Sequence, residues 1–256
     1  MDPWQAAAVF AAGIAAGTIN AVVGSGTLIT FPTLLAVGYP PVTANVSNNI
    51  GLVFGGMTGT WGYRRELEGQ AHRLRRLVPM SLVGSIVGAL LLLRLPPSAF
   101  AAIVPALILF SVVLVLIQPR LAVAVQKRRA ATGRPGDHVG VLAMVATLAA
   151  GVYGGYFGAA QGVLLIGILG AVLDESLQRV NAAKNALSLV VNLVAAVTFL
   201  VVRPQAVDWH VVALIAVGSF IGGVLGARVG RSLSPAVLRG VVALVGIVAV
   251  IRLLTS

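Results

Sequence analysis

No charged side chain occurs between Pro3 and Tyr63. A helix needs about 20 apolar residues to cross the hydrocarbon core of a bilayer, so this stretch is long enough to enter and leave a membrane more than once. A second stretch, from His138 to Leu173, contains no charged residue besides its histidine. Only 10% of the chain is charged, against roughly 25% in a soluble domain. The sequence therefore predicts an all-α integral membrane protein.

The apolar runs, divided at charges and at Pro/Gly breaks, predict four hydrophobic elements, a basic linker and four more elements. The first element of each set is interrupted by a glycine-rich break. The predicted elements are Gln5–Gly38 (broken at Gly24–Thr27), Val42–Tyr63, Leu77–Leu93, Ser98–Ile117, Val139–Leu173 (broken around Gly158–Gly162), Leu177–Val202, Trp209–Ala227 and Pro235–Leu254.

The two sets of elements resemble each other residue by residue, which indicates an internal duplication. We predict a first membrane repeat at 1–117, a basic cytoplasmic linker at 118–137 and a second repeat at 138–256. The matched positions are Gly13/Gly151, Gly17/Gly155, Gly26/Gly162, Asn45/Asn181, Asn48/Lys184, Asn49/Asn185, Gly84/Gly218, Ser85/Ser219 and Gly88/Gly222.

Basic residues gather in loops, and positive charge in short loops marks the cytoplasmic side of a membrane. The net charge of +11 is therefore attributed to topology, and no nucleic-acid partner is expected. Three basic segments would then be cytoplasmic: the loop around Arg64–Arg76, the linker and Arg228–Arg231. This is possible only if each broken element folds back, as a hairpin or re-entrant segment. The repeats are then inverted, as in many secondary transporters. A parallel repeat with four simple spans per half is the alternative, and it would place Arg228 and Arg231 outside.

The two glycine breaks are candidates for a binding site. Unwound backbone at membrane depth is tolerated only where protein or a wet cavity supplies hydrogen-bond partners. A helix that begins after such a break exposes N–H donors and a partial positive charge, which favour an anion. The alternative is that the glycines only allow close helix packing, and this is the interpretation we adopt for Gly13, Gly17, Gly151 and Gly155.

Lys184 is one of two lysines in the chain and lies about two turns inside the apolar run Leu177–Val202. A cation at such depth usually faces a partner or a substrate path. Asparagines and a serine follow it at helical spacing, so we predict an anion site around Lys184. The alternative is a lysine that extends its ammonium group to the lipid headgroups beside Arg179. The polar stripe consists of Asn181, Asn185, Ser188 and Asn192, and the first half supplies Asn20, Asn45, Asn48 and Asn49.

Several kinds of chemistry are not expected. All seven acidic residues fall outside the apolar cores, the chain has no cysteine, and no nucleotide-binding glycine loop or nucleophile motif is present. We therefore predict no enzymatic activity, catalytic residue, cofactor or metal site. Because no basic segment precedes the first apolar stretch, we expect it to be retained rather than cleaved. Asp174 and Glu175 are interpreted as solvated loop residues, with a cavity mouth as the alternative.

The sequence resembles the sulfite exporter TauE/SafE family of membrane permeases over nearly its whole length. The resemblance rests on Ala16–Pro32, which contains Gly24-Ser25-Gly26 followed by Leu-Ile-Thr-Phe-Pro, on Gly38–Asn45, and on Gly154–Gly162 with Asn181–Asn185. It implies a duplicated permease for sulfur-containing anions such as sulfite or sulfonates. Family members often carry a lysine in the first-half motif, where this sequence has Asn48.

These observations predict a secondary permease of the bacterial cytoplasmic (inner) membrane that moves a small anion by alternating access. An uncoupled anion channel and a non-transporting scaffold subunit are the alternatives. The expected partners are a small anion and the lipid bilayer, and the chain is a candidate homo-oligomer. The predicted substrate-binding residues are Lys184, Asn48, Asn49, Asn181, Asn185, Asn45, Asn20, Ser25, Gly26, Thr27, Gln161 and Gly162.

Overall fold

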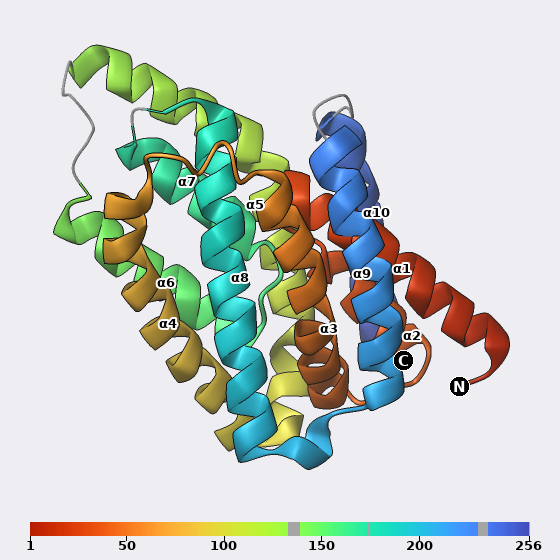
Figure 1. The fold of residues 1–256 in the computed structure, drawn as a ribbon. Helices are drawn as coiled ribbons and strands as arrows, with labels where there is room; N and C mark the ends of the chain where they lie inside the picture. Colours follow the sequence, from red (N-terminus) through yellow and green to blue (C-terminus); the bar gives the residue numbers. More distant parts are fainter. Residues whose placement is uncertain (133–138, 174, 230–234, 256) are drawn as a thin grey trace.

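The computed structural model describes residues 1–132, 139–173, 175–229 and 235–255, and these ranges contain helices and no strand (Figure 1). The predicted all-α membrane fold is confirmed. The elements are α1 (Pro3–Val22), α2 (Thr27–Ala36), α3 (Pro41–Gly62), α4 (Ala71–Arg94), α5 (Pro97–Thr132), α6 (Val141–Tyr156), α7 (Gln161–Val172), α8 (Leu177–Val202), η1 (Pro204–Ala206), α9 (Trp209–Val229) and α10 (Pro235–Thr255).

Both glycine breaks interrupt a helix where the sequence predicts, between α1 and α2 and between α6 and α7. The helix α5 differs from its predicted bounds, because it continues from Ile117 to Thr132, into the stretch interpreted as a linker. Pro97 occupies the first turn of α5, where a missing N–H has no cost, and Pro105 and Pro119 lie inside the helix without ending it. The rest of the predicted linker, including Arg134, lies outside the described residues, as does Asp174.

Each broken element consists of two successive helices that contact each other, α1 with α2 and α6 with α7. With 10 residues in α2 and 12 in α7, these helices reach about 15–18 Å, roughly half of a bilayer core. Val139 before α6 and Leu173 after α7 belong to one hydrophobic cluster with Val180 of α8. In Figure 1 the open end of the α1–α2 pair lies at the lower right, and that of the α6–α7 pair lies at the upper left.

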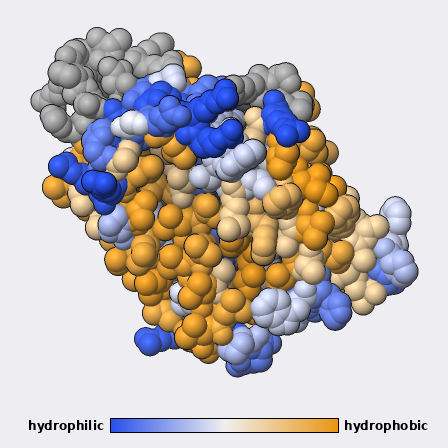
Figure 2. Space-filling view, in the orientation of Figure 1, coloured by the Kyte–Doolittle hydropathy of each residue, from blue (hydrophilic) through white to orange (hydrophobic). Residues whose placement is uncertain are grey.

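A broad apolar belt surrounds the helices. Among the described residues, six helices are long and apolar enough to cross a membrane: α1, α4, the first part of α5, α8, α9 and α10. Figure 2 shows hydrophilic residues concentrated along the upper edge, a smaller number along the lower edge, and hydrophobic side chains between them. Large hydrophobic side chains exposed on this belt include Leu116, Val201 and Leu244, at 52%, 76% and 64%. Such a surface is stable in lipid and not in water.

The two halves pack against each other through matched pairs of helices, α1 with α9 and α6 with α4. A Cβ atom on Gly17 would lie 2.3 Å from the carbonyl oxygen of Ser219, and one on Gly155 would lie 2.3 Å from that of Ser85. Likewise, a Cβ on Gly222 would meet the backbone of α1, and one on Gly88 would meet that of α6. The packing role predicted for Gly13, Gly17, Gly151 and Gly155 is confirmed, and the duplicated sequence positions make equivalent contacts.

An ion-pair network links the two halves of the chain near the start of α8, at the upper edge in Figure 1. Glu175, before α8, accepts from Arg73 Nη1 of α4 and from Arg179 Nε, both at 2.6 Å. Arg179 also donates from Nη2 to the carbonyl oxygen of Glu68 (2.9 Å). Burial raises the pKa of Glu175, but the two guanidinium donors outweigh it and hold that pKa below its ordinary value. Glu175 is therefore an ion-pair residue, and its interpretation as a solvated loop residue is wrong.

Candidate functional site

The two glycine breaks touch each other in the interior of the molecule. The backbone N–H of Gly162 donates to the carbonyl oxygen of Gly24 at 3.1 Å. A Cβ atom added to either glycine would lie 2.5 Å from the Cα atom of the other. Gly24 also has a φ of +86°, which L residues with side chains rarely adopt. The two breaks can therefore cross only because both positions lack a side chain.

Asparagine side chains bind the carbonyl groups left free where α1 and α6 end. In the second half, Asn181 and Asn185 both donate from Nδ2 to the carbonyl oxygen of Ala21, at 3.0 and 3.2 Å. In the first half, Asn45 donates in the same way to Tyr156, the last residue of α6, at 3.0 Å. A helix end buried in an apolar medium needs such partners. These asparagines thus satisfy the broken helices, and any contact with a substrate remains a prediction.

Lys184 lies at the crossing of the two breaks and is completely buried. Its Nζ donates to the carbonyl oxygen of Asn20 at 2.7 Å, in the last turn of α1. Its Cδ would be 2.9 Å from a Cβ on Gly162, so the aliphatic part of the side chain runs directly behind the break. The negative end of the α1 dipole stabilises this cation. The alternative of a lysine reaching toward the headgroups is wrong, because the ammonium is held inside the protein.

The counterpart of Lys184 in the first half is bound differently. Asn48 accepts from Thr30 Oγ1 at 2.5 Å and donates from Nδ2 to Thr27 Oγ1 at 3.4 Å. It therefore holds the first turn of α2 and does not cap the end of a helix. Its neighbour Asn49 donates to Asn192 Oδ1 of α8 at 3.5 Å, which links α3 to α8.

The start of α2 is held by a side chain from the preceding helix. Asn20 accepts from the backbone N–H of Gly26 through Oδ1 at 2.6 Å, while its own carbonyl oxygen accepts from Lys184. One residue thus connects the end of α1, the start of α2 and the buried cation. Ser25, between the two helices, is 1% exposed, and its Oγ has no hydrogen-bond partner among the described residues.

A small polar cavity lies beside the crossing. Its volume is about 30 Å³, enough for one or two water molecules. Five of the predicted binding residues line it. The other seven do not line the cavity, and several of them bind backbone or side-chain groups behind it. These seven residues are Lys184, Asn45, Asn48, Asn49, Asn181, Ser25 and Gly26. The lining consists of Asn20, Ala21, Gly24, Thr27, Gly55, Gly56, Gly158, Gln161, Gly162, Asn185, Ser188, Leu189 and Asn192.

Eight lining residues were absent from the predicted binding set: Ala21, Gly24, Gly55, Gly56, Gly158, Ser188, Leu189 and Asn192. Ser188 and Asn192 follow Asn185 on the same helical face, so the polar stripe already indicated them. Gly55 and Gly56 of α3 correspond to Val191 and Asn192 of α8 in the duplicated alignment. A comparison of the two halves therefore gives no signal for these glycines, and only the tertiary structure places them at the cavity.

The electrostatic environment of the cavity is positive. Thr27 and Gln161 are the first residues of α2 and α7, so the positive ends of two helix dipoles meet there. Lys184 lies directly behind the break, and no carboxylate is among the lining residues of the described chain. Gln161 is 3% exposed and its Nε2 has no partner in the described structure, nor does Ser188 Oγ. The cavity thus offers unused hydrogen-bonding groups in a field that favours an anion.

No group of three or more His, Cys, Asp or Glu side chains in the described ranges is arranged to hold a metal ion. The chemistry available at the crossing is therefore hydrogen bonding by amides and hydroxyls, with charge from Lys184 and the helix ends.

A polar cavity between broken helices, enclosed in an apolar belt of spanning helices, defines a multi-pass membrane transport protein. Residues 9–253 match the family described as sulfite exporter TauE/SafE. The chain belongs to this family, and it is accordingly a transporter of the bacterial cytoplasmic membrane and not an enzyme.

Curated relatives of the same class are similar to this chain over nearly their whole length. The chain is 27% identical to the probable membrane transporter protein ORF9 of a Sinorhizobium species, covering 97% of this chain and 92% of the relative. It is 26% identical to the probable membrane transporter protein YfcA of Escherichia coli K12, covering 99% and 91%. A probable membrane transporter protein of Haemophilus influenzae is 25% identical over 92% of this chain and 89% of its own length. No solved structure matches the chain.

Proposed function

We propose that this transporter moves a small anion, a sulfur oxyanion or an organosulfonate, and binds it where the two breaks cross. The observation that carries the proposal is the convergence of two helix N-termini and the buried Lys184 on one polar cavity whose described lining has no carboxylate. An anion would take the place of water there and accept from Gln161, Ser188 and Thr27. The family description supports the sulfur chemistry.

Alternating access is the mechanism that the geometry supports best. The cavity has room for one or two waters and is bordered by the backbone contact between Gly24 and Gly162. A channel requires a continuous wet path, whereas a closed central site requires the walls to move. The proposed motion is a rocking of one repeat against the other across the matched α1–α9 and α6–α4 contacts.

The repeats are proposed to be inverted, with 1–117 and 138–256 as the two units. The opposite directions of the α1–α2 and α6–α7 pairs in Figure 1 and the equivalent glycine contacts support this arrangement. The basic loop 63–70 packs against the start of α8 through Gln70, whose Nε2 donates to the carbonyl oxygen of Arg179 at 3.0 Å. The first basic loop and the start of α8 thus lie on the same face, which supports the cytoplasmic assignment of that loop. Assembly into a homo-oligomer remains a prediction.

The proposal is tested with the purified protein, first by thermal stabilisation in detergent and then by uptake into proteoliposomes. Sulfite, thiosulfate, sulfoacetate and sulfate are compared with taurine at equal ionic strength. A bound ligand at 100 times its Kd stabilises by about 2.7 kcal/mol. We expect one or more of the anions to raise the melting temperature, and taurine to have a smaller effect because its ammonium group is repelled by Lys184 and the helix ends.

The matched control is Lys184→Met, which keeps the aliphatic stem and removes the charge. The affinity for the anions and the rate of their uptake should both fall by about tenfold or more, since a buried charge partner contributes more than about 1.4 kcal/mol. Equal stabilisation of both proteins by every anion, or uptake of taurine in preference to the anions, would overturn the proposal.

A further inference from the structure

The polar side of the cavity comes from one helix face. Asn185, Ser188 and Asn192 are spaced three and four residues apart on α8, so they lie above one another on the same face. All three line the cavity, and Gly55 and Gly56 of α3 line it opposite them. A polar stripe therefore continues from the crossing along α8, facing a wall without side chains.

This arrangement is not repeated in the other half. The α3 residues that correspond to Asn185, Ser188 and Asn192 are Asn49, Leu52 and Gly56. Leu52 is 2% exposed and belongs to the main hydrophobic cluster. In the described lining of the cavity, this polar stripe therefore belongs to α8, and the α3 residues that line it are Gly55 and Gly56, which supply space.

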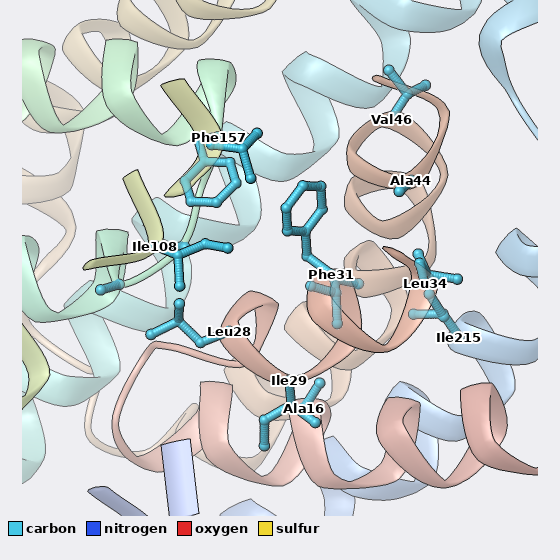
Figure 3. Packing of buried hydrophobic residues seen from close by; sticks show 14 of the residues in the cluster. Ala16, Leu28, Ile29, Phe31, Leu34, Ala44, Val46, Ile108, Phe157 and Ile215 are labelled. Atoms are coloured by element: carbon cyan, nitrogen blue, oxygen red, sulfur yellow. The ribbon is translucent and has the colours of Figure 1, made fainter. Parts of the chain in front are cut away.

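Aromatic rings pack around the first half of the crossing. Phe31 of α2 packs edge-on against Phe157, with ring centroids 5.2 Å apart, and Phe100 packs against Tyr156 at 5.6 Å. Figure 3 shows Phe31 and Phe157 facing each other, with Leu28 and Ile108 beside them. The crossing is therefore apolar on the side of these rings, whereas the polar lining of the cavity comes partly from α8.

The stripe also contains hydrogen-bonding groups that are not used within the described chain. Ser188 Oγ has no partner there, and Asn192 Oδ1 is held only by the long 3.5 Å bond from Asn49. An unpaired polar group buried in an apolar medium costs about 1–3 kcal/mol. Its presence at helical spacing beside a cavity indicates that water or a substrate binds there during transport.

The direction of the stripe follows from the course of α8. The helix begins at Leu177, beside the ion-pair network of Arg73, Glu175 and Arg179. Ser188 and Asn192 lie progressively further from that network. From the crossing to Asn192 the stripe therefore runs away from the Arg-rich face, where the network joins the two halves.

We propose that the substrate path between the crossing and the non-cytoplasmic face runs between α8 and α3, with Ser188 and Asn192 as its polar wall and Gly56 as its size-limiting position. This path deepens the proposed function and rests on it for the identity of the substrate as an anion. A Cβ on Gly56 would lie 3.2 Å from Leu189 Cδ1 across the path. Gly56→Ala therefore narrows the path and should slow a large sulfonate more than sulfite.

The absence of native cysteine makes the path directly testable. Ser188→Cys and Asn192→Cys are labelled in right-side-out vesicles with a membrane-impermeant anionic methanethiosulfonate. Leu52→Cys is the matched control at the duplicated position, and Val197→Cys is a lipid-facing control on the same helix, 53% exposed. Thiolates form only in contact with water. Both path variants should react about tenfold faster than both controls, and faster with the anionic than with a cationic reagent.

Labelling of Ser188→Cys and Asn192→Cys no faster than that of Leu52→Cys would overturn the path, provided that gel filtration shows folded protein. Each path variant serves as a check if the other does not fold. Protection of the cysteines by sulfoacetate supports both proposals. Fast labelling that no anion slows, with no preference for the anionic reagent, upholds the path and overturns the anion as its substrate.

Discussion

The Nζ atom of Lys184 donates a 2.7 Å hydrogen bond to the main-chain carbonyl oxygen of Asn20. This contact connects α8 of the second half to the last turn of α1 in the first half, across the point where the two breaks meet. Lys184 therefore serves the fold by pairing with a helix end and the cavity by placing a positive charge behind it. Variants that keep or remove the aliphatic part of the side chain distinguish its packing from the combined effect of its donor and its charge.

Lys184→Ala should destabilise the protein and reduce anion transport, whereas Lys184→Met should reduce transport with a smaller loss of stability. The methionine preserves packing behind Gly24 and Gly162, while alanine also leaves a cavity, at a cost of about 2–4 kcal/mol in total. Thermal unfolding in detergent and uptake into proteoliposomes measure the two effects. Wild-type uptake by a folded Lys184→Met protein would show that the charge has no part in transport.

Asn181→Ala and Asn185→Ala should be non-additive. Both side chains donate to the same carbonyl oxygen, that of Ala21. Either single variant leaves one donor and should cost under about 1 kcal/mol, while the double variant leaves the carbonyl unpaired and should cost about 2 kcal/mol or more. A double-mutant cycle of melting temperatures measures the coupling.

Asn45→Ala provides the comparison for that cycle. Asn45 is the side-chain donor seen at Tyr156 in the described chain, so its single replacement should cost about as much as the double variant at Ala21. Strictly additive losses at Asn181 and Asn185 would contradict the shared role of these two residues.

Gly162→Ala should strongly destabilise the crossing, because its Cβ would lie 2.5 Å from the Cα of Gly24. Gly24→Ala should be worse, since it combines the same clash with a φ of +86° and so adds about 1–2 kcal/mol. Yield of folded protein and melting temperature measure both variants.

Two further glycines separate the causes. Gly38 has a φ of +95° and no neighbour within 4 Å of an added Cβ atom, so Gly38→Ala should show only the cost of the backbone conformation. Gly240→Ala, in the helix α10 with open space around it, should be neutral or stabilising by up to about 1 kcal/mol. A tolerated Gly162→Ala would show that the two breaks do not touch as described.

Glu175 should contribute to stability in a pH-dependent way. Its pKa is lower in the folded protein than its ordinary value of 4.5, so its stabilising effect is fully present above that value. The effect is lost as the pH falls through the lower folded pKa. In melting curves between pH 3 and pH 8, Glu175→Gln should lower stability at neutral pH by about 1–2 kcal/mol, a modest amount because Arg179 is partly exposed.

At the acid end of this range the difference in stability between Glu175→Gln and the wild type should shrink, because the wild-type carboxyl becomes protonated and loses its charge there. Glu68→Gln is a suitable control, since Glu68 contacts Arg179 through its backbone carbonyl oxygen. A constant difference across the whole pH range would rule out the ion pair as the cause.

The sequence by itself determined the membrane class, the helices and the positions of both breaks. Lipid excludes charges and unpaired backbone groups, so apolar runs and their glycine interruptions are visible in the order of residues alone. Thr27, Gln161, Gly162, Asn20 and Asn185 were also found at the cavity because the duplication marked the breaks and the asparagine stripes.

Only the tertiary structure decided which of these polar groups face the cavity and which hold the backbone. Lys184, Asn181 and Asn45 were predicted from their depth in apolar helices, but their hydrogen bonds go to carbonyl groups at the ends of helices from the other half. Such partners are far apart in the sequence, and Gly55 and Gly56 acquire a role only because α3 lies against α8. The order of residues shows that a buried polar group must find a partner, whereas the packing of the two halves determines which partner it finds.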